Sequence, residues 1–247
     1  MSTTVGPSAY WYLTRSSGIV ALVLLTGSVA VGVLDVARVG GPRWPRFVVD
    51  GVHRTVSLLA VVFLAVHILT AVLDSFAPIS LVNALIPFTG TYRPLWLGFG
   101  ALATDLLIAV TLTSIARRRL GHRAWRVTHW LAYACWPIAV IHGLGTGSDV
   151  TQAWLQWINA ACVLVVLGAV AARAIVGWPE HVRVRLTALA VALAFAAALL
   201  IWLPSGPLGA HWARRAGTPS SLLSPSSTAS SAPGSGVAQA VGGTRSA

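Results

Sequence analysis

The chain has 247 residues, of which 56% are hydrophobic and only 9% are charged, and its mean hydropathy is +0.76. Because a soluble domain of this size carries about 25% charged residues, the composition excludes an ordinary soluble enzyme. The net charge of +11 comes from arginine without any lysine, in short segments between apolar runs, which is typical of membrane topology and excludes a nucleic-acid-binding face.

Six apolar segments are long enough to cross a lipid bilayer, whose core of about 30 Å needs about 20 helical residues. In chain order they cover roughly 17–37, 53–75, 95–116, 127–146, 153–175 and 185–203. The first segment lacks a small-residue cleavage site after it, so we expect a retained span and not a signal peptide. The sequence therefore predicts an all-α polytopic membrane helix bundle of six transmembrane helices over 17–203, preceded by an N-terminal outer segment over 1–16.

The segment after the last span differs sharply in composition. From about Gly206 the chain is rich in Ser, Pro, Gly, Ala and Thr, with too little apolar surface to offset the entropy of ordering. We predict an outer-side flexible tail over 204–247, disordered over 213–247. No glycine-rich nucleotide fingerprint follows a strand, so we expect no flavin or NADPH domain and a separate electron donor.

Arginines mark the first, third and fifth connections between the spans. These connections hold 12 of the 17 arginines: Arg38, Arg43, Arg46, Arg54, Arg117, Arg118, Arg119, Arg123, Arg126, Arg173, Arg183 and Arg185. The second and fourth connections hold only Arg93. Since arginine-rich loops stay on the cytoplasmic side, we predict a multi-pass protein of the plasma (cytoplasmic) membrane with both termini outside.

Four histidines lie within two of the predicted spans. His53 and His67 are fourteen residues apart on the second span, and His129 and His142 are thirteen apart on the fourth. At about 1.5 Å per residue, each spacing separates its two histidines by about 20 Å. The two spans run parallel, and a haem iron takes one nitrogen ligand on each side of its ring. We therefore predict two haems, one between His53 and His129 and one between His67 and His142.

The haems would be held by ligation and packing alone. The CxxCH motif for covalent attachment is absent, so the prediction is two haem b, and we expect Cys135 and Cys162 to be packing residues. At about 100° per residue, a fourteen-residue spacing places His53 and His67 within about 40° of each other around the helix axis. A thirteen-residue spacing places His142 about 140° away from His129. A kink at Pro137 is the expected source of the correction.

Arginines near the two pairs are candidate partners of the haem propionates. Arg54 and Arg126 flank the cytoplasmic pair, and Arg15 and Arg93 are placed for the outer pair; the alternative for each is an interfacial anchor. We take Arg15, Arg54 and Arg126 as cofactor-binding candidates. Asp105, in mid-span, is interpreted as a neutral buried acid, a hydrogen-bonding group, or a proton or quinone contact.

Several strings give a resemblance to a known family. Besides the histidine offsets, they are Tyr12-Leu13-Thr14-Arg15 before Gly18, Pro87-Phe88, Tyr92-Arg93-Pro94, and His129-Trp130-Leu131-Ala132-Tyr133. Over about residues 10–175 the chain resembles the ferric reductase-like transmembrane domain of ferric reductases, NADPH oxidases and the haem subunit of bacterial periplasmic methionine sulfoxide reductase. The resemblance implies outward electron flow, with His53 and His129 on the cytoplasmic haem, His67 and His142 on the outer haem, and Arg15 near the outer propionates. The family's cytoplasmic flavin and NADPH domain is not seen after the last span.

The leading hypothesis is a dihaem b-type membrane cytochrome, the haem-carrying transmembrane component of an oxidoreductase. It would take electrons from quinol or a separate flavoprotein and deliver them to an outer-side acceptor, namely ferric iron, oxygen or a reductase partner. Two alternatives stay open: a cytochrome b561-like quinone or ascorbate reductase, and a haem-free transporter whose histidines and Asp105 form a proton relay. Electron-donor preference would identify the first, and lack of haem absorbance the second.

Overall fold

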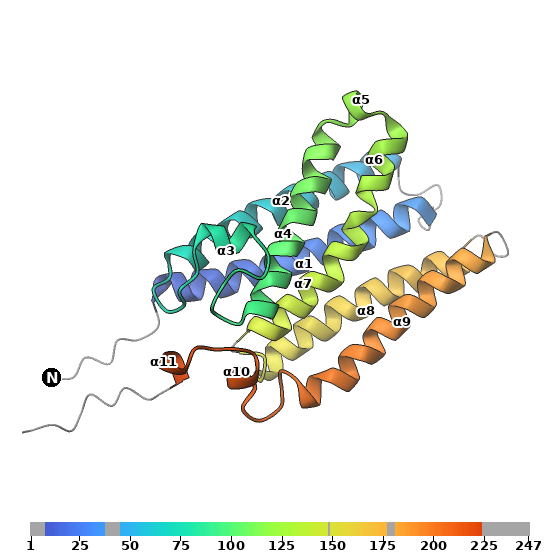
Figure 1. Ribbon diagram of the computed structural model, residues 1–247. Helices are drawn as coiled ribbons and strands as arrows, with labels where there is room; N and C mark the ends of the chain where they lie inside the picture. Colours follow the sequence, from blue (N-terminus) through green and yellow to red (C-terminus); the bar gives the residue numbers. More distant parts are fainter. Residues whose placement is uncertain (1–7, 38–44, 148, 177–180, 224–247) are drawn as a thin grey trace, which may run out of the picture.

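The computed structural model describes residues 8–37, 45–147, 149–176 and 181–223, and these ranges contain helices and no β-strand. Figure 1 shows the helices as an elongated bundle. Their bounds are α1 (Ala9–Ala37), α2 (Arg46–Leu73), α3 (Leu81–Leu85), α4 (Pro94–Ile115), α5 (Arg117–Leu120), α6 (His122–His129), α7 (Leu131–Thr146), α8 (Ala153–Ile175), α9 (Val182–Ser205), α10 (Trp212–Arg215) and α11 (Ser220–Leu223).

Five of these helices, α1, α2, α4, α8 and α9, are long and apolar enough to cross a membrane. The predicted all-helical, multi-pass membrane fold is therefore confirmed. The predicted fourth span is divided, because α6 ends at His129 and α7 has only 16 residues. At the division, the Tyr133 N–H donates to the Trp130 carbonyl three residues earlier, a tighter turn than the α-helical one.

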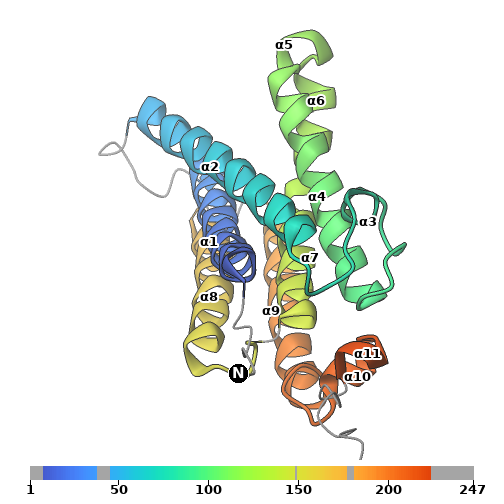
Figure 2. The ribbon, with the colours of Figure 1, turned by 90° about the vertical axis from the view of Figure 1, so that its left-hand side faces the viewer.

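The helices pack in two neighbouring groups. The main contacts join α1 to α2 and to α8, α4 to α7, and α8 to α9. Figure 2 shows α1, α2 and α8 on one side of the bundle and α4, α7 and α9 on the other. Between the groups lies an apolar core in which Val140 and Cys135 of α7 are fully buried. Both cysteines are buried and free, as their predicted packing role requires.

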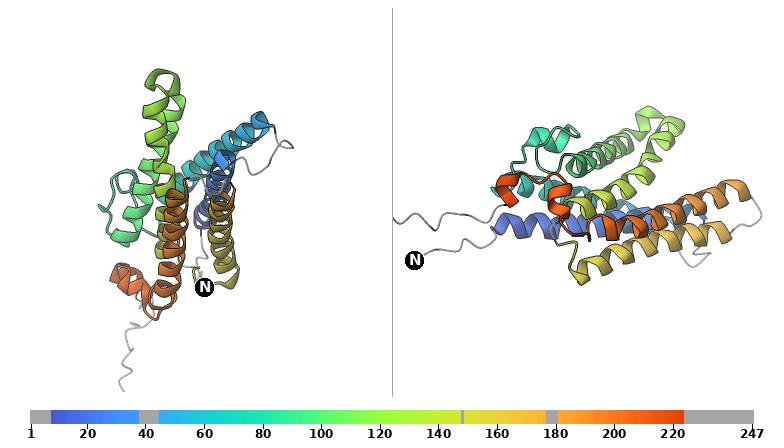
Figure 3. Two further views of the ribbon diagram at one scale, coloured as in Figure 1. Left: turned by 90° about the vertical axis from the view of Figure 1, so that its right-hand side faces the viewer. Right: turned by 60° about the horizontal axis from the view of Figure 1, so that its bottom comes forward.

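The segment after α9 is folded in its described part. Beyond Ser205 the chain turns back and forms α10 and α11, which Figure 3 shows at the end of the bundle where α9 ends. The prediction of disorder from residue 213 is wrong for 213–223. The local composition does not show that Ala216 is buried and that Trp212 packs against Trp96 of α4. Residues 224–247, like Arg38 and Arg43 of the first connection, lie outside the described residues.

Candidate functional site

The four histidines of the two spans meet in the two predicted pairs. The ring centroids of His53 and His129 are 6.1 Å apart with planes at 67°, and those of His67 and His142 are 6.3 Å apart with planes at 80°. Two histidines come from α2, one is the last residue of α6, and one lies in α7. All four side chains are half-buried. An interruption within the thirteen-residue spacing lies at Trp130, between α6 and α7, and α7 is helical on both sides of Pro137; the kink expected at Pro137 stays a prediction.

Three of the four rings are oriented by a backbone carbonyl of a neighbouring helix. His67 Nδ1 lies 2.7 Å from the Thr14 carbonyl oxygen, and His53 Nδ1 lies 3.1 Å from the Ser28 carbonyl oxygen. His142 Nδ1 lies 2.9 Å from the Trp96 carbonyl oxygen. A carbonyl accepts only, so Nδ1 carries the proton and the lone pair is on Nε2. Among the described residues, no hydrogen bond engages Nε2 of any of the four.

A glycine follows each of these carbonyls by four residues on the same helix. A Cβ at Gly18 would lie 2.8 Å from His67 Nδ1, one at Gly100 2.5 Å from His142 Nδ1, and one at Gly32 3.4 Å from His53 Cε1. The missing side chain lets the imidazole reach a carbonyl that also accepts the helix bond. Sequence reasoning missed these glycines, although Gly18 and Gly32 have the same fourteen-residue spacing as His53 and His67.

His129 lacks such an anchor. Its Nδ1 is buried and has no hydrogen-bond partner among the described residues. Instead its ring lies 5.1 Å from the Trp125 ring, with the two planes at 32°, and the Arg117 guanidinium lies over the same Trp125 ring, 4.5 Å from its centroid. The His129 ring is therefore held by stacking on its own helix.

The spacing of each pair fits one iron between two imidazoles. A metal–imidazole bond is about 2.0–2.1 Å long and the ring centre lies roughly 1.1 Å behind the nitrogen, so two such ligands have centroids about 6.3 Å apart. Nδ1 bonds to carbonyls are the usual support of ligating histidines. In the described part of the chain, no cluster of three or more His, Cys, Asp or Glu side chains could hold a bare metal ion. The residues present thus fit axial ligation of haem.

A cavity of about 300 Å³ contains the His67–His142 pair. Its walls come from α1, α2, α4, α7 and α8, and most of them are apolar, whereas one end carries Arg15, Asp74 and Asp149. This combination of an apolar pocket with few charged groups at one end is typical of cofactor sites. His53 and His129 do not line this cavity.

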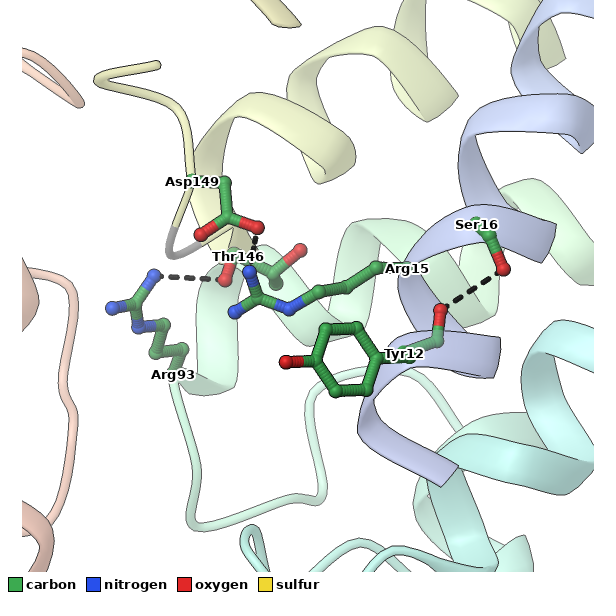
Figure 4. A network of polar contacts seen from close by, with 6 residues as sticks. All are labelled: Tyr12, Arg15, Ser16, Arg93, Thr146 and Asp149. Atoms are coloured by element: carbon green, nitrogen blue, oxygen red, sulfur yellow. Dashed lines mark hydrogen bonds and ion pairs between the residues drawn. The ribbon is translucent and has the colours of Figure 1, made fainter. Parts of the chain in front are cut away.

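The candidate arginines fall into different environments. Arg15 lies at the charged end of the cavity, forms an ion pair with Asp149, and stacks over Trp11 with 3.5 Å from guanidinium carbon to ring centroid; Figure 4 shows it reaching towards Asp149. Arg54 and Arg126 are exposed, on α2 beside His53 and on α6 one turn before His129. Arg93 is buried, and its Nη1 donates to the Gly145 and Thr146 carbonyls at the end of α7, so it caps that helix.

The remaining candidates lie apart from the pairs. Asp105 is half-buried, does not line the cavity, and has no partner among the described residues. His122, His181 and His211 are exposed, in agreement with their position in connecting segments.

The sequence of the chain is similar to that of a known protein family and to that of a curated protein. The family model "Ferric reductase like transmembrane component" matches residues 17–140, half of the chain, which includes His53, His67 and His129. The protein-methionine-sulfoxide reductase heme-binding subunit MsrQ of Ralstonia nicotianae is 29% identical over 140 residues, or 56% of this chain and 59% of that protein. The chain thus spans about three fifths of the length of this curated relative. No solved structure matches. With four histidines paired across its helices, the chain belongs to the ferric reductase-like transmembrane component family.

Proposed function

We propose that the protein is a dihaem b-type membrane cytochrome that passes electrons from a cytoplasmic-side donor, quinol or a separate flavoprotein, to an outer-side acceptor. The observation that carries this proposal is the pair of imidazole spacings, 6.1 and 6.3 Å, at two depths of the same helices. Below, the inner pair is His53 with His129, and the outer pair is His67 with His142.

The histidines prepare two sites of the same kind. By donating Nδ1–H to a carbonyl, His53, His67 and His142 keep the lone pair on Nε2, and such a bond strengthens the nitrogen as a ligand. A bound haem supplies reversible one-electron reduction at its iron, with a potential set by its ligands and burial. Around the outer pair, the helices supply a mostly apolar cavity wall.

Two sites divide the distance across the membrane. His53 and His67 are separated by about 21 Å along α2, since each residue advances about 1.5 Å. A bilayer core is about 30 Å thick, so a single site at mid-depth would be far from both surfaces. One pair near each face places an electron within reach of a partner on either side.

The same pairing argues for six crossings. Because His129 faces His53 and His142 faces His67, the segment formed by α6 and α7 runs beside α2 over the same depth. We therefore infer that this segment crosses the same thickness of membrane as α2, despite the turn at Trp130. With arginine-rich connections inside, both termini lie outside. A reporter fused after Ala247 should behave as extracytoplasmic, whereas a cytoplasmic result would contradict the six-span arrangement.

Arginines near each pair are proposed partners of the haem propionates. Arg15 is a side chain 22% exposed at the end of the cavity that holds the outer pair, where a guanidinium can bind a carboxylate through two parallel bonds. Arg54 and Arg126 would serve the inner pair from its hydrated edge. In the structure Arg15 forms an ion pair with Asp149, so a propionate would either share the guanidinium with Asp149 or take the place of Asp149.

The family and the relative support a proposal about the partners. The relative's name describes a haem-binding subunit of a protein-methionine-sulfoxide reductase, so we propose that this chain is likewise the membrane component of a multi-subunit oxidoreductase. A reductase partner outside the membrane, ferric iron or oxygen would then be the acceptor. The subunit itself needs no acceptor pocket beyond access to the outer haem.

Haem content tests the proposal directly. Purified full-length protein should carry close to two non-covalent haems per chain, with a low-spin reduced-minus-oxidised spectrum, because both pairs offer two nitrogens to one iron. A ratio near one would leave one pair unused. A protein without haem absorbance would instead support the proton-relay transporter.

A further inference from the structure

The segment directly after α9 folds back as a hook, defined here as residues 206–218. Its first turn is fixed by the Leu208 N–H, which donates to the Leu203 carbonyl of α9. Its end reaches the start of α4, where a Cβ at Gly217 would lie 3.0 Å from Pro94 Cδ. At φ +87, Gly217 also adopts a backbone conformation that favours glycine. The hook therefore joins α9 to α4 at one end of the bundle.

The hook accepts two hydrogen bonds from Arg93. The Arg93 N–H donates to the Gly217 carbonyl at 3.0 Å, and Arg93 Nε donates to Thr218 Oγ1 at 2.9 Å. The same buried guanidinium caps α7 through the Gly145 and Thr146 carbonyls, at 3.1 and 2.9 Å from Nη1, where a helix end attracts positive charge. Figure 4 shows the bond from Arg93 to Thr146. One side chain thus ties the hook, α4 and α7 together.

Trp212 makes a second connection between the same elements. Its Nε1 donates to the Gly145 carbonyl at 3.2 Å, and its ring centroid is 5.1 Å from that of Trp96 and 5.9 Å from that of Trp202. Trp96 and Trp202 are stacked at 5.0 Å. Gly145 leaves room for this cluster, since a Cβ there would lie 2.3 Å from the Trp96 ring.

Both partners of one histidine anchor are attached to this cluster. The acceptor is the carbonyl of Trp96, and the donor is Nδ1 of His142, whose own carbonyl accepts from Thr146 Oγ1. We propose that the hook is a positioning element for the outer pair, in which Trp212 and Thr218 fix the orientation of His142. The hook lines no part of the described cavity and acts through α4 and α7. This inference rests on the proposed function, because the position of His142 matters for haem.

The experiment uses the full-length protein with only one haem site intact. His53→Ala leaves the outer pair and His67→Ala leaves the inner pair, and Trp212→Leu is introduced into each background. In the outer-only background we expect about tenfold weaker haem retention, the cost typical of lost support behind a ligand. The low-spin electron paramagnetic resonance signal should also change, since it depends on the angle between the two imidazole planes. In the inner-only background, neither quantity should change.

Three further variants separate the contacts. Trp212→Phe keeps a ring but removes the Nε1–H, and Thr218→Val keeps the shape but removes the acceptor of Arg93; both should give smaller losses, again in the outer site alone. Arg214→Gln, on the exposed side of α10, is the matched control and should behave as the parent. If Trp212→Leu weakens both sites equally, or neither, the hook is only a structural element and the inference is wrong. If the parent with the outer pair binds no haem at all, the proposed function fails first.

Discussion

The two histidine pairs have nearly the same ring spacing but differ in how the surrounding helices hold them. In the outer pair both Nδ1 atoms are anchored, at 2.7 and 2.9 Å, and both rings face a glycine. In the inner pair only His53 is anchored, at the longer distance of 3.1 Å, and the buried Nδ1 of His129 has no partner in the described chain. Histidine pairs of nearly equal spacing can therefore have unequal support, which depends on helix carbonyls and glycines.

The difference follows from position along α4. On α4, the Trp96 carbonyl supports His142. His129 lies thirteen residues before His142, so the corresponding carbonyl on an antiparallel α4 is that of Ala109, thirteen residues after Trp96. That carbonyl already accepts from Thr113 Oγ1 at 2.7 Å, and Thr113 stands where the other sites have glycine. In addition, His129 is the last residue of α6, and Figure 2 shows α5 and α6 extending beyond the neighbouring helices.

Removing a ligand should have the largest effect and should test the pairing itself. His67→Ala and His142→Ala should each abolish the same haem, and His53→Ala and His129→Ala the other, because each iron loses one of two axial nitrogens. About half of the total haem should disappear in each variant, measured by haem-to-protein ratio and difference spectra. If His67→Ala and His129→Ala deplete one common haem, the comparison of pairs has no basis.

Filling the glycine contacts should separate the two sites. Gly100→Ala places a Cβ 2.4 Å from His142 Cε1, so we expect the outer haem to be retained about tenfold less well. Gly32→Ala meets His53 at 3.4 Å only, and the inner haem should be almost unchanged. Gly168→Ala, with nothing within 4 Å, is the control and should keep both haems. Equal losses from Gly100→Ala and Gly168→Ala would show that helix glycines do not support the ligands.

Exogenous ligands should bind first where support is weakest. Carbon monoxide added to the reduced protein is expected to displace His129, whose orientation depends on Trp125, before it displaces any anchored histidine. The spectral change should therefore affect the haem component that is missing in His53→Ala. A change confined to the component missing in His67→Ala would reverse the comparison.

Charge at the cavity end should produce the smallest effect. Arg15→Gln removes a cation near the outer pair and should lower the midpoint potential of that haem, because the reduced state gains negative charge; Asp149→Asn should raise it. The shifts should stay below about tenfold in the equilibrium constant, since a partly hydrated ion pair is screened. Redox titration of both components tests this, with the inner component as internal control. Shifts of the same sign in the two variants would argue against Arg15 acting by charge.

The sequence was sufficient to predict the membrane fold and the partners within each histidine pair. Residue types decided both: apolar length defines spans, and imidazoles at matched depths define pairs. The direction of His142 was harder to predict, because an ideal helix of 100° per residue places it far from His129. Between the two histidines the structure has a tight turn at Trp130, which no proline or glycine marks.

The anchors and the hook could not be predicted for a different reason. Backbone carbonyls have no sequence signature, so only the fourteen-residue repeat of Gly18 and Gly32 could have indicated two of them. The hook was hidden by its composition, which is that of a disordered segment. Its order depends on contacts with Arg93 and Trp96, more than a hundred residues away in the chain, and such partners are invisible to local composition.

The contact between α1 and α2 also has a consequence for assembly in the membrane. Two side-chain bonds join these helices, from Thr14 to Thr70 and between Ser28 and Ser57, and a third joins Ser8 to Asp74, directly before α1 and directly after α2. Together with the two carbonyl anchors, which recur every fourteen residues on both helices, they make the register of the hairpin unique: a slip by one turn breaks every bond at once. The first two helices can therefore find their final alignment soon after insertion, before α4 or α7 has been synthesised. His53 and His67 of α2, one from each histidine pair, are then already at their final separation when the remaining helices arrive.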